Sequence, residues 1–279
     1  MKRSSFHNLT GDTKLSFFGK IIYFIYVFIE KFLLDLYPLK KKKYTSKIDF
    51  DKIKLFHGAN DLFDFSPQRI LANSLIIDLT EKINFSYMLD LGCGTGVYKN
   101  YFNNIGKNFS YLGIDIKGQK NNNEILEYDL GPSFPNLENI KDKVDFIFSQ
   151  SALEHIRYDL EVIRWSIEKF PNAKHLHIIP APMSAICYNL HGFRRYSNYT
   201  LKKLTDCFPS NVEIYSIGNS TTRKLYMSYF KNKFKKNHKF EKLFGSENYY
   251  NWLENSESLQ LTDPKSSGGP EFYALFYDR

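Results

Sequence analysis

A short apolar segment, residues 87–91, runs directly into five residues in which glycine stands at the alternate positions 92, 94 and 96. Glycine adopts positive φ angles without a Cβ clash, so this loop can turn tightly and let its backbone approach a ligand. From about Val97 the chain is expected to form a helix whose N-terminus points toward the same ligand. This strand–loop–helix unit predicts an α/β fold with a ligand site at the carboxyl end of the strand.

Short apolar runs and helical segments alternate along the following chain. The runs are bounded by Gly, Asp or Asn, which is typical of strands buried in a parallel sheet. Strand and helix in alternation predict an α/β sheet with right-handed crossovers. The expected strands are 87–91, 111–116, 125–128, 144–148, 175–179, 212–217 and 272–277, and the expected helices include 70–77, 158–170 and 199–208.

An acidic residue, Asp115, ends the second of these strands, at a distance from the glycine loop that suits a nucleoside site. A carboxylate at this position can accept hydrogen bonds from two ribose hydroxyls. A dinucleotide site would have its third glycine at the position of Val97, so a pyrophosphate ligand is disfavoured. The phosphate-binding loop Gly-x-x-x-x-Gly-Lys-Ser/Thr does not occur in the sequence, which disfavours a nucleotide triphosphatase.

At these residues the chain resembles the class I S-adenosylmethionine-dependent methyltransferases, especially their broad small-molecule group. MLDLGCGTGVY is similar to the family's first motif, YLGIDIK to its acidic motif, and VDFIFSQSALEHI to its fourth-strand motif. The resemblance covers about residues 87–208, and it is looser to glycan-associated members. It implies S-adenosyl-L-methionine as the cofactor and a Rossmann-like, doubly wound, seven-stranded sheet, mostly parallel, with an antiparallel last strand.

The resemblance also assigns cofactor contacts. Gly92, Cys93, Gly94 and Gly96 would shape the loop around the methionine moiety, and Asp90 would face its amino group. Asp115 would hold the ribose, and Ile116 would pack against the adenine. Asp129 and Leu130 would lie near the adenine edge, and Ser149 and Gln150 would line the cofactor from the fourth strand. The alternative for Asp129 is an ordinary loop acid.

Two histidines are candidates for removing a proton from a hydroxyl acceptor, a task that suits imidazole. His155 follows the fourth strand, and His191 follows the fifth, where the acceptor is expected. Next to His191, the side chains of Arg194, Arg195 and Tyr196 could bind a phosphate or carboxylate of the acceptor. The alternatives are that His155 supports its loop and that one arginine pairs with a structural carboxylate. No ligand spacing along the sequence predicts a metal site.

The N-terminal segment is basic and apolar. Residues 1–54 hold 12 Lys+Arg and five Asp+Glu, which is +7 of the net +8. Within residues 15–39 the uncharged run 21–29 is too short to span a bilayer as a helix. It therefore predicts either an interfacial helix on an anionic membrane or a helix packed on the protein. We expect residues 1–43 to form this segment, 44–65 a linker, and 66–279 the catalytic domain with an insertion at about 221–270.

These patterns together predict O-methylation of a small, sugar or lipid-linked acceptor. The three cysteines cannot form a disulfide framework, which indicates a reducing compartment, here the cytoplasm or the inner membrane face. A second basic stretch, residues 223–242, interleaves lysines with aromatic rings and leaves an RNA-directed methyltransferase as an alternative. A non-catalytic membrane-associated module is the third hypothesis.

Overall fold

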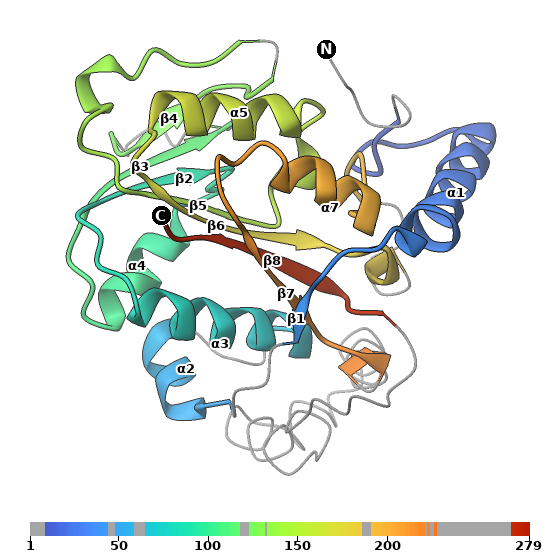
Figure 1. Ribbon diagram of the computed structural model, residues 1–279, viewed down its shortest axis with the longest axis horizontal. Coiled ribbons are helices and arrows are strands. Elements are labelled where there is room, and N and C mark those ends of the chain that lie inside the picture. Colours follow the sequence, from blue (N-terminus) through green and yellow to red (C-terminus); the bar gives the residue numbers. More distant parts are fainter. Residues whose placement is uncertain are drawn as a thin grey trace.

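The computed structural model describes residues 9–43, 48–58, 65–117, 123–131, 133–185, 191–220, 222–223, 226–227 and 269–279. Its centre is one sheet with the strand order β1-β7-β8-β6-β5-β2-β3-β4 (Figure 1). The strands are β1 (Lys42–Lys43), β2 (Tyr87–Leu91), β3 (Ser110–Asp115), β4 (Ile125–Glu127), β5 (Phe146–Gln150), β6 (Lys174–Pro180), β7 (Glu213–Ile217) and β8 (Phe272–Tyr277).

Strand β8 lies antiparallel between β6 and β7, and all other neighbouring strands are parallel. The predicted seven-stranded sheet with an antiparallel last strand is therefore confirmed for β2–β8. The two-residue strand β1 adds an eighth member beside β7 and brings the chain after the N-terminal helix to the edge of the sheet.

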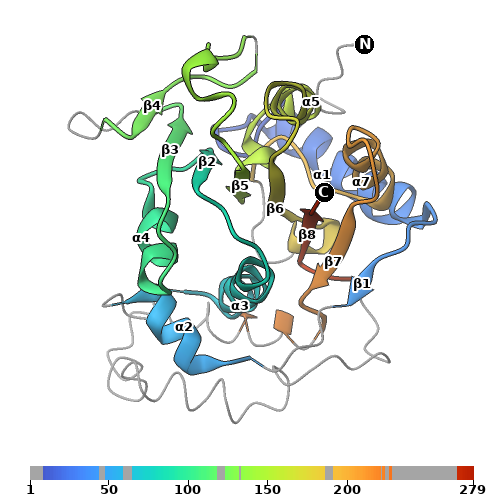
Figure 2. The same cartoon turned by 60° about the vertical axis from the view of Figure 1, so that its left-hand side comes forward.

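Helices cover both faces of the sheet (Figures 1 and 2). Alternate residues of β5 face opposite layers: Phe146 and Phe148 pack with α2, α3 and α4, whereas Ile147 packs with α5 and α7. This alternation is the period of two expected for strands buried on both faces. The helices are α1 (Phe17–Phe32), α2 (Phe50–His57), α3 (Pro67–Glu81), α4 (Val97–Asn104), α5 (Asp159–Lys169) and α7 (Asn198–Thr205), with 3-10 turns η1 (Leu34–Leu36), η3 (Glu138–Ile140), η4 (Leu153–His155) and η5 (Pro182–Ser184).

The predicted linker over residues 44–65 is wrong at its centre, where the chain forms α2. The Asp49 side chain accepts a hydrogen bond from the Lys52 backbone N–H and caps this helix. Ile53 and Phe56 are fully buried against α3 and α4. Residues 48–58 therefore belong to the core of the domain.

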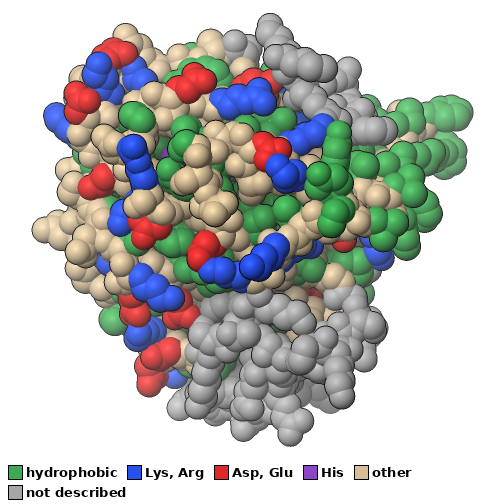
Figure 3. Space-filling model, viewed as in Figure 1, with side chains coloured by type: hydrophobic (Ala, Val, Ile, Leu, Met, Phe, Trp, Pro, Cys, Tyr) green, Lys and Arg blue, Asp and Glu red, His purple; other side chains and the backbone are tan. Residues whose placement is uncertain are grey.

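Helix α1 packs on the domain through one narrow face and leaves the other open. Tyr23, Tyr26 and Glu30 are buried, whereas Phe24 and Phe28 are 59% and 57% exposed. Figure 3 shows hydrophobic side chains gathered at the edge of the molecule where α1 lies. Among the described residues, no helix combines the length and the apolar character needed to cross a bilayer. Most of the predicted insertion, including most of the second basic stretch, lies outside the described residues.

Candidate functional site

The glycine loop after β2 takes the conformation that its sequence predicts. Gly92, Gly94 and Gly96 have φ angles of 71°, 57° and 74°, a region that side chains with a Cβ rarely enter. A Cβ at Gly92 would lie 2.4 Å from the Cβ of Ala152, whereas a Cβ at Gly94 would meet nothing within 4 Å. The loop is therefore packed against the protein at Gly92 and open at Gly94, where a ligand can approach the backbone.

Asp115, at the end of β3, is held beside this loop. Its Oδ2 accepts a hydrogen bond of 2.8 Å from the Gly94 backbone N–H, and its Oδ1 accepts one of 3.0 Å from the Lys117 N–H. Each carboxylate oxygen has a second lone pair available for a ligand hydroxyl. The predicted ribose-binding acid is thus fixed in orientation at the carboxyl edge of the sheet.

A cavity of about 750 Å³ opens in front of the loop. Five of the predicted cofactor residues line it: Gly92, Asp115, Ile116, Asp129 and Leu130. Part of its remaining wall comes from residues that follow β4 and β5: Tyr128, Ser151, Ala152, His155, Ile156, Arg157 and Tyr158. The cavity therefore joins the carboxyl ends of neighbouring parallel strands, where ligands of open α/β sheets bind.

Other predicted cofactor residues lie behind this wall. Asp90 is 1% exposed, and its Oδ2 accepts a hydrogen bond of 3.1 Å from the Tyr111 hydroxyl. Burial raises the pKa of Asp90 to about 7, although the Tyr111 bond opposes this change. Burial also raises the pKa of the Cys93 thiol to about 12, so this cysteine is packed as a neutral group beneath the loop.

The end of β5 places its residues differently from the prediction. Ser149 is fully buried, and its Oγ lies 2.8 Å from Nδ1 of His177. Neither Ser149 nor Gln150 lines the cavity, whereas Ser151 and Ala152 do. Ser151 has a φ of 50°, a sparsely populated conformation for a residue other than glycine, and it turns the chain into the cavity wall. The cavity-lining residues after β5 therefore lie one or two positions later than the predicted ones.

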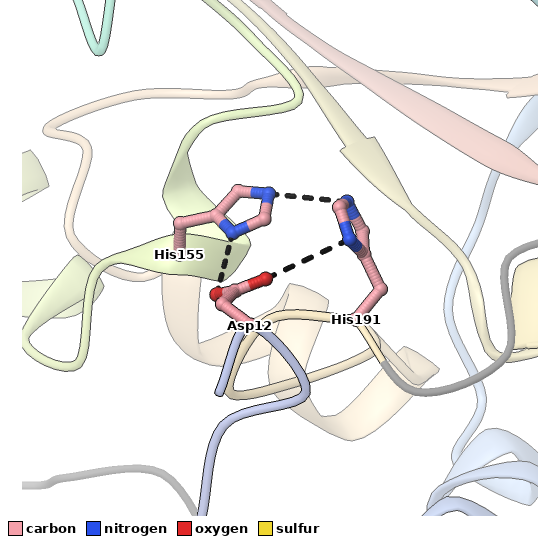
Figure 4. A group of neighbouring side chains, drawn as sticks. All are labelled: Asp12, His155 and His191. Carbon is pink, nitrogen blue, oxygen red and sulfur yellow. Dashed lines mark hydrogen bonds and ion pairs between the residues drawn. The ribbon is translucent and has the colours of Figure 1, made fainter. Parts of the chain in front are cut away.

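The two candidate catalytic histidines meet, and a third residue joins them (Figure 4). His155 Nδ1 lies 2.8 Å from Oδ2 of Asp12, and His191 Nδ1 lies 3.7 Å from Oδ1 of the same carboxylate. The Nε2 atoms of the two rings lie 3.1 Å apart. Asp12 and His155 line the cavity, so this cluster borders the space in front of the glycine loop.

The carboxylate of Asp12 sets the charge of the cluster. Burial lowers the pKa of His155, but the bond to Asp12 and the nearby Glu154 outweigh it and raise the pKa above its ordinary value. Burial and the charge of His155 lower the pKa of His191 to about 4. The pKa of Asp12 lies well below its usual range, because the bonds from His155 and Thr10 outweigh the cost of burial. At most one of the two rings therefore carries a positive charge near neutral pH.

Arg194, Arg195 and Tyr196 do not face the cavity, which corrects their prediction as acceptor-binding residues. All three are nearly or fully buried. Arg194 Nη2 lies 3.2 Å from one oxygen of Asp159, and the Tyr196 hydroxyl donates a hydrogen bond of 2.8 Å to the other. Arg195 donates to the backbone carbonyl of His191. These side chains hold the loop that carries His191, which is the structural alternative considered for the arginines.

Sequence reasoning missed Asp12 and Glu154. Asp12 precedes His155 by 143 positions in a segment with no motif, so only the folded chain brings them together. Glu154 stands next to a predicted residue, and its burial at 1% exposure is the property that distinguishes it from an ordinary surface acid.

No family model matches the chain, and no curated protein matches it. Solved structures that align with it include phosphoethanolamine N-methyltransferase 2 of Haemonchus contortus in complex with S-adenosyl-L-methionine, at 14% identity and a TM-score of 0.47. That alignment covers 82% of this chain and 56% of that chain. A putative methyltransferase from an antibiotic biosynthesis pathway of Anabaena variabilis aligns at 12% identity and a TM-score of 0.46, over 77% of this chain and 100% of that one. A SAM-dependent methyltransferase of Archaeoglobus fulgidus aligns at 16% identity and a TM-score of 0.45. This alignment covers 78% of this chain and 97% of that chain.

Proposed function

We propose that the protein is an S-adenosylmethionine-dependent methyltransferase. The observation that carries the proposal is the glycine loop with Asp115 beside it at the mouth of a cavity. The open space at Gly94 and the free lone pairs of Asp115 fit a nucleoside whose ribose and amino-acid ends lie along the loop. The volume of about 750 Å³ leaves room for both a cofactor and an acceptor.

The bound cofactor would supply a methyl group already activated on a sulfonium sulfur. The protein then has to bind the acceptor in line and to remove a proton where that acceptor is a hydroxyl. Asp12 and His155 line the same cavity as Gly92 and Asp115, so an acceptor between them would share one space with the cofactor. His155, whose ring contacts His191, is therefore the part of this wall suited to handling a hydroxyl proton.

For the acceptor, we infer a small, sugar or lipid-linked hydroxyl compound presented at the cytoplasmic membrane face. Support comes from α1, which exposes an apolar face and packs directly on the loop that carries His191. The Tyr23 hydroxyl donates a hydrogen bond of 2.6 Å to the His191 carbonyl, and Asp12 precedes the same helix. An interfacial helix in this position would bring the cavity close to lipid headgroups.

Calorimetric titration with S-adenosylmethionine and with its product, S-adenosylhomocysteine, tests the central proposal. We expect binding by the full-length protein and a loss of about 10- to 100-fold in affinity for Asp115→Ala, because two hydrogen bonds to a charged acceptor are removed. Asp142→Ala, which removes an exposed acid away from the cavity, serves as the control and should bind like the wild type. A folded wild-type protein that binds neither compound would overturn the proposal.

A further inference from the structure

One carboxylate lies beside both histidines of the cluster. Asp12 lies on the Nδ1 side of His155 and of His191, at 2.8 and 3.7 Å. Proton donation from His155 Nδ1 to this carboxylate fixes the tautomer in which Nε2 of His155 carries a lone pair, whereas His191 Nδ1 lies beyond hydrogen-bonding distance of the carboxylate. In this arrangement the Nε2 atoms of the two rings turn toward each other at 3.1 Å (Figure 4). At this distance the lone pair of His155 Nε2 requires a proton or a cation between the two nitrogens.

A buried carboxylate stands beside the same point. Glu154 is 1% exposed, and its Oε1 lies 3.9 Å from His155 Nε2. Its Oε2 is buried and has no hydrogen-bond partner among the described residues. A buried carboxylate oxygen without a partner costs folding free energy, so a cation or a hydrogen-bond donor bound at this point would stabilise Glu154.

The backbone holds these groups rigidly. The Glu154 carbonyl accepts a hydrogen bond of 2.6 Å from the Phe193 N–H, and a Cβ at Gly192 would lie 2.6 Å from the same oxygen. The Gly192 N–H donates to Asp12 Oδ1 at 3.1 Å. The turn η4, the loop at 191–193 and the N-terminal segment are therefore tied together around the two rings.

The geometry points to a site for one divalent cation, bound by Nε2 of His155, Nε2 of His191 and the carboxylate of Glu154, with Asp12 orienting His155. The separation of 3.1 Å between the nitrogens matches two adjacent ligands at right angles with bonds of about 2.1 Å. One ligand atom from each of Asp12, His155 and His191 lies within 4.8 Å of the others, so these three side chains converge on one point. Imidazole with carboxylate favours Mn²⁺, Fe²⁺, Co²⁺ or Zn²⁺ over Mg²⁺ or Ca²⁺.

Charge and access agree with a cation. Asp12 and Glu154 together carry two negative charges when ionised, and Arg195, which contacts the loop at the His191 carbonyl, supplies one positive charge. The side chains of Asp12, His155 and His191 are 34%, 33% and 41% exposed. A cation can therefore enter beside His155, which lines the cavity, and keep positions open for water or for an acceptor oxygen.

The role of this cation rests on the proposed function. The cation would hold the acceptor hydroxyl in the cavity and lower its pKa, so that its proton passes to cavity water. The acceptor oxygen then forms the new bond to the methyl carbon. The bond between that carbon and sulfur breaks, and sulfur keeps the electron pair and becomes a neutral thioether. In this scheme the two histidines act as ligands and not as bases.

Titration of the metal-free, full-length protein with Mn²⁺ tests the site without any methyl transfer. We expect the electron paramagnetic resonance signal of free Mn²⁺ to fall with a stoichiometry of one, and Co²⁺ to give an absorption spectrum typical of nitrogen ligands. His191→Gln and Asp12→Asn alter partly exposed side chains and should weaken Mn²⁺ binding at least 10-fold. Asp129→Asn removes a carboxylate from the same cavity outside the cluster and should leave Mn²⁺ affinity unchanged.

Two results would overturn the inference: no Mn²⁺ or Co²⁺ binding by the folded wild type, or equal binding by the wild type and both cluster variants. In the first case the two histidines share a proton instead. Cofactor titration in the presence of a chelator, run on the same preparation, separates the two proposals. Cofactor binding without metal binding would remove only the cation site, whereas metal binding without cofactor binding would remove only the methyltransferase.

Discussion

At the scale of single residues, two glycines of one loop have the same backbone requirement and opposite surroundings. Alanine at either position costs about 1–2 kcal/mol for a left-handed conformation. Gly92→Ala also places a methyl group 2.4 Å from Ala152, so we expect a large drop in melting temperature. Gly94→Ala meets no neighbour, so it should stay folded but lose cofactor affinity, because its methyl group occupies the ligand's approach. Thermal unfolding and calorimetry check both, and wild-type cofactor affinity in Gly94→Ala would contradict the assignment of the loop.

A buried acid on α1 makes stability depend on pH. Burial raises the pKa of Glu30 to about 7, even though Ser197 and Arg194 favour its charged form. The folded state therefore binds the proton more tightly than the unfolded chain, whose glutamate has a pKa of about 4.5. This contribution to stability is complete below that value and is lost as the pH rises through 7.

Glu30→Gln keeps the neutral form at every pH. We expect it to raise the free energy of unfolding at pH 8 by about 1–3 kcal/mol relative to the wild type, and to have little effect at pH 5. Urea unfolding at several pH values measures the difference. Glu168→Gln, which changes an exposed glutamate on α5, should show no such trend. A difference between Glu30→Gln and the wild type that is the same at pH 5 and pH 8 would contradict the role of Glu30.

At the scale of elements, the sequence pattern predicted the features that depend only on residues close to one another in the chain. The strands from β2 onward, the glycine loop and Asp115 follow from apolar runs and backbone requirements within a few residues of each other. Helix α2 was mistaken for part of a linker, because four of its eight residues are charged or histidine and its buried face is only a few side chains wide. Its helical state depends on packing against α3 and α4, which no short window of sequence contains.

The site shows the same division between local and distant information. His155 and His191 could be found by their places after β5 and β6, yet their partner Asp12 comes from the N-terminal segment, where the sequence suggested only a membrane or packing helix. The reverse holds for Arg194 and Tyr196, whose residue types suit an acceptor but whose side chains point to the buried Asp159. Side-chain direction in a loop depends on tertiary contacts, so residue type alone mispredicted their role.

At the scale of the whole molecule, charge and apolar surface coincide at the N-terminal segment. Residues 1–54 carry +7 of the net +8. Helix α1, which lies within this basic segment, exposes aromatic and aliphatic side chains. Helices α1 and α2 lie at opposite ends of the molecule (Figures 1 and 2). Attachment to an anionic surface through α1 would leave the α2 layer facing away from lipid and the His191 loop close to it.

Vesicle flotation tests this orientation in the full-length protein. We expect binding to vesicles that contain phosphatidylserine and a decrease in binding as salt is raised, because exposed charges are screened. The double substitution Phe24→Ser/Phe28→Ser should reduce the bound fraction at least 10-fold. Each Phe side chain that enters the membrane interface contributes about 1.5–3 kcal/mol to the binding free energy. Leu55→Ser removes a side chain of similar exposure, 56%, from α2 and should bind like the wild type. If the α1 and α2 variants floated equally well, α1 would be a face for another protein rather than for lipid.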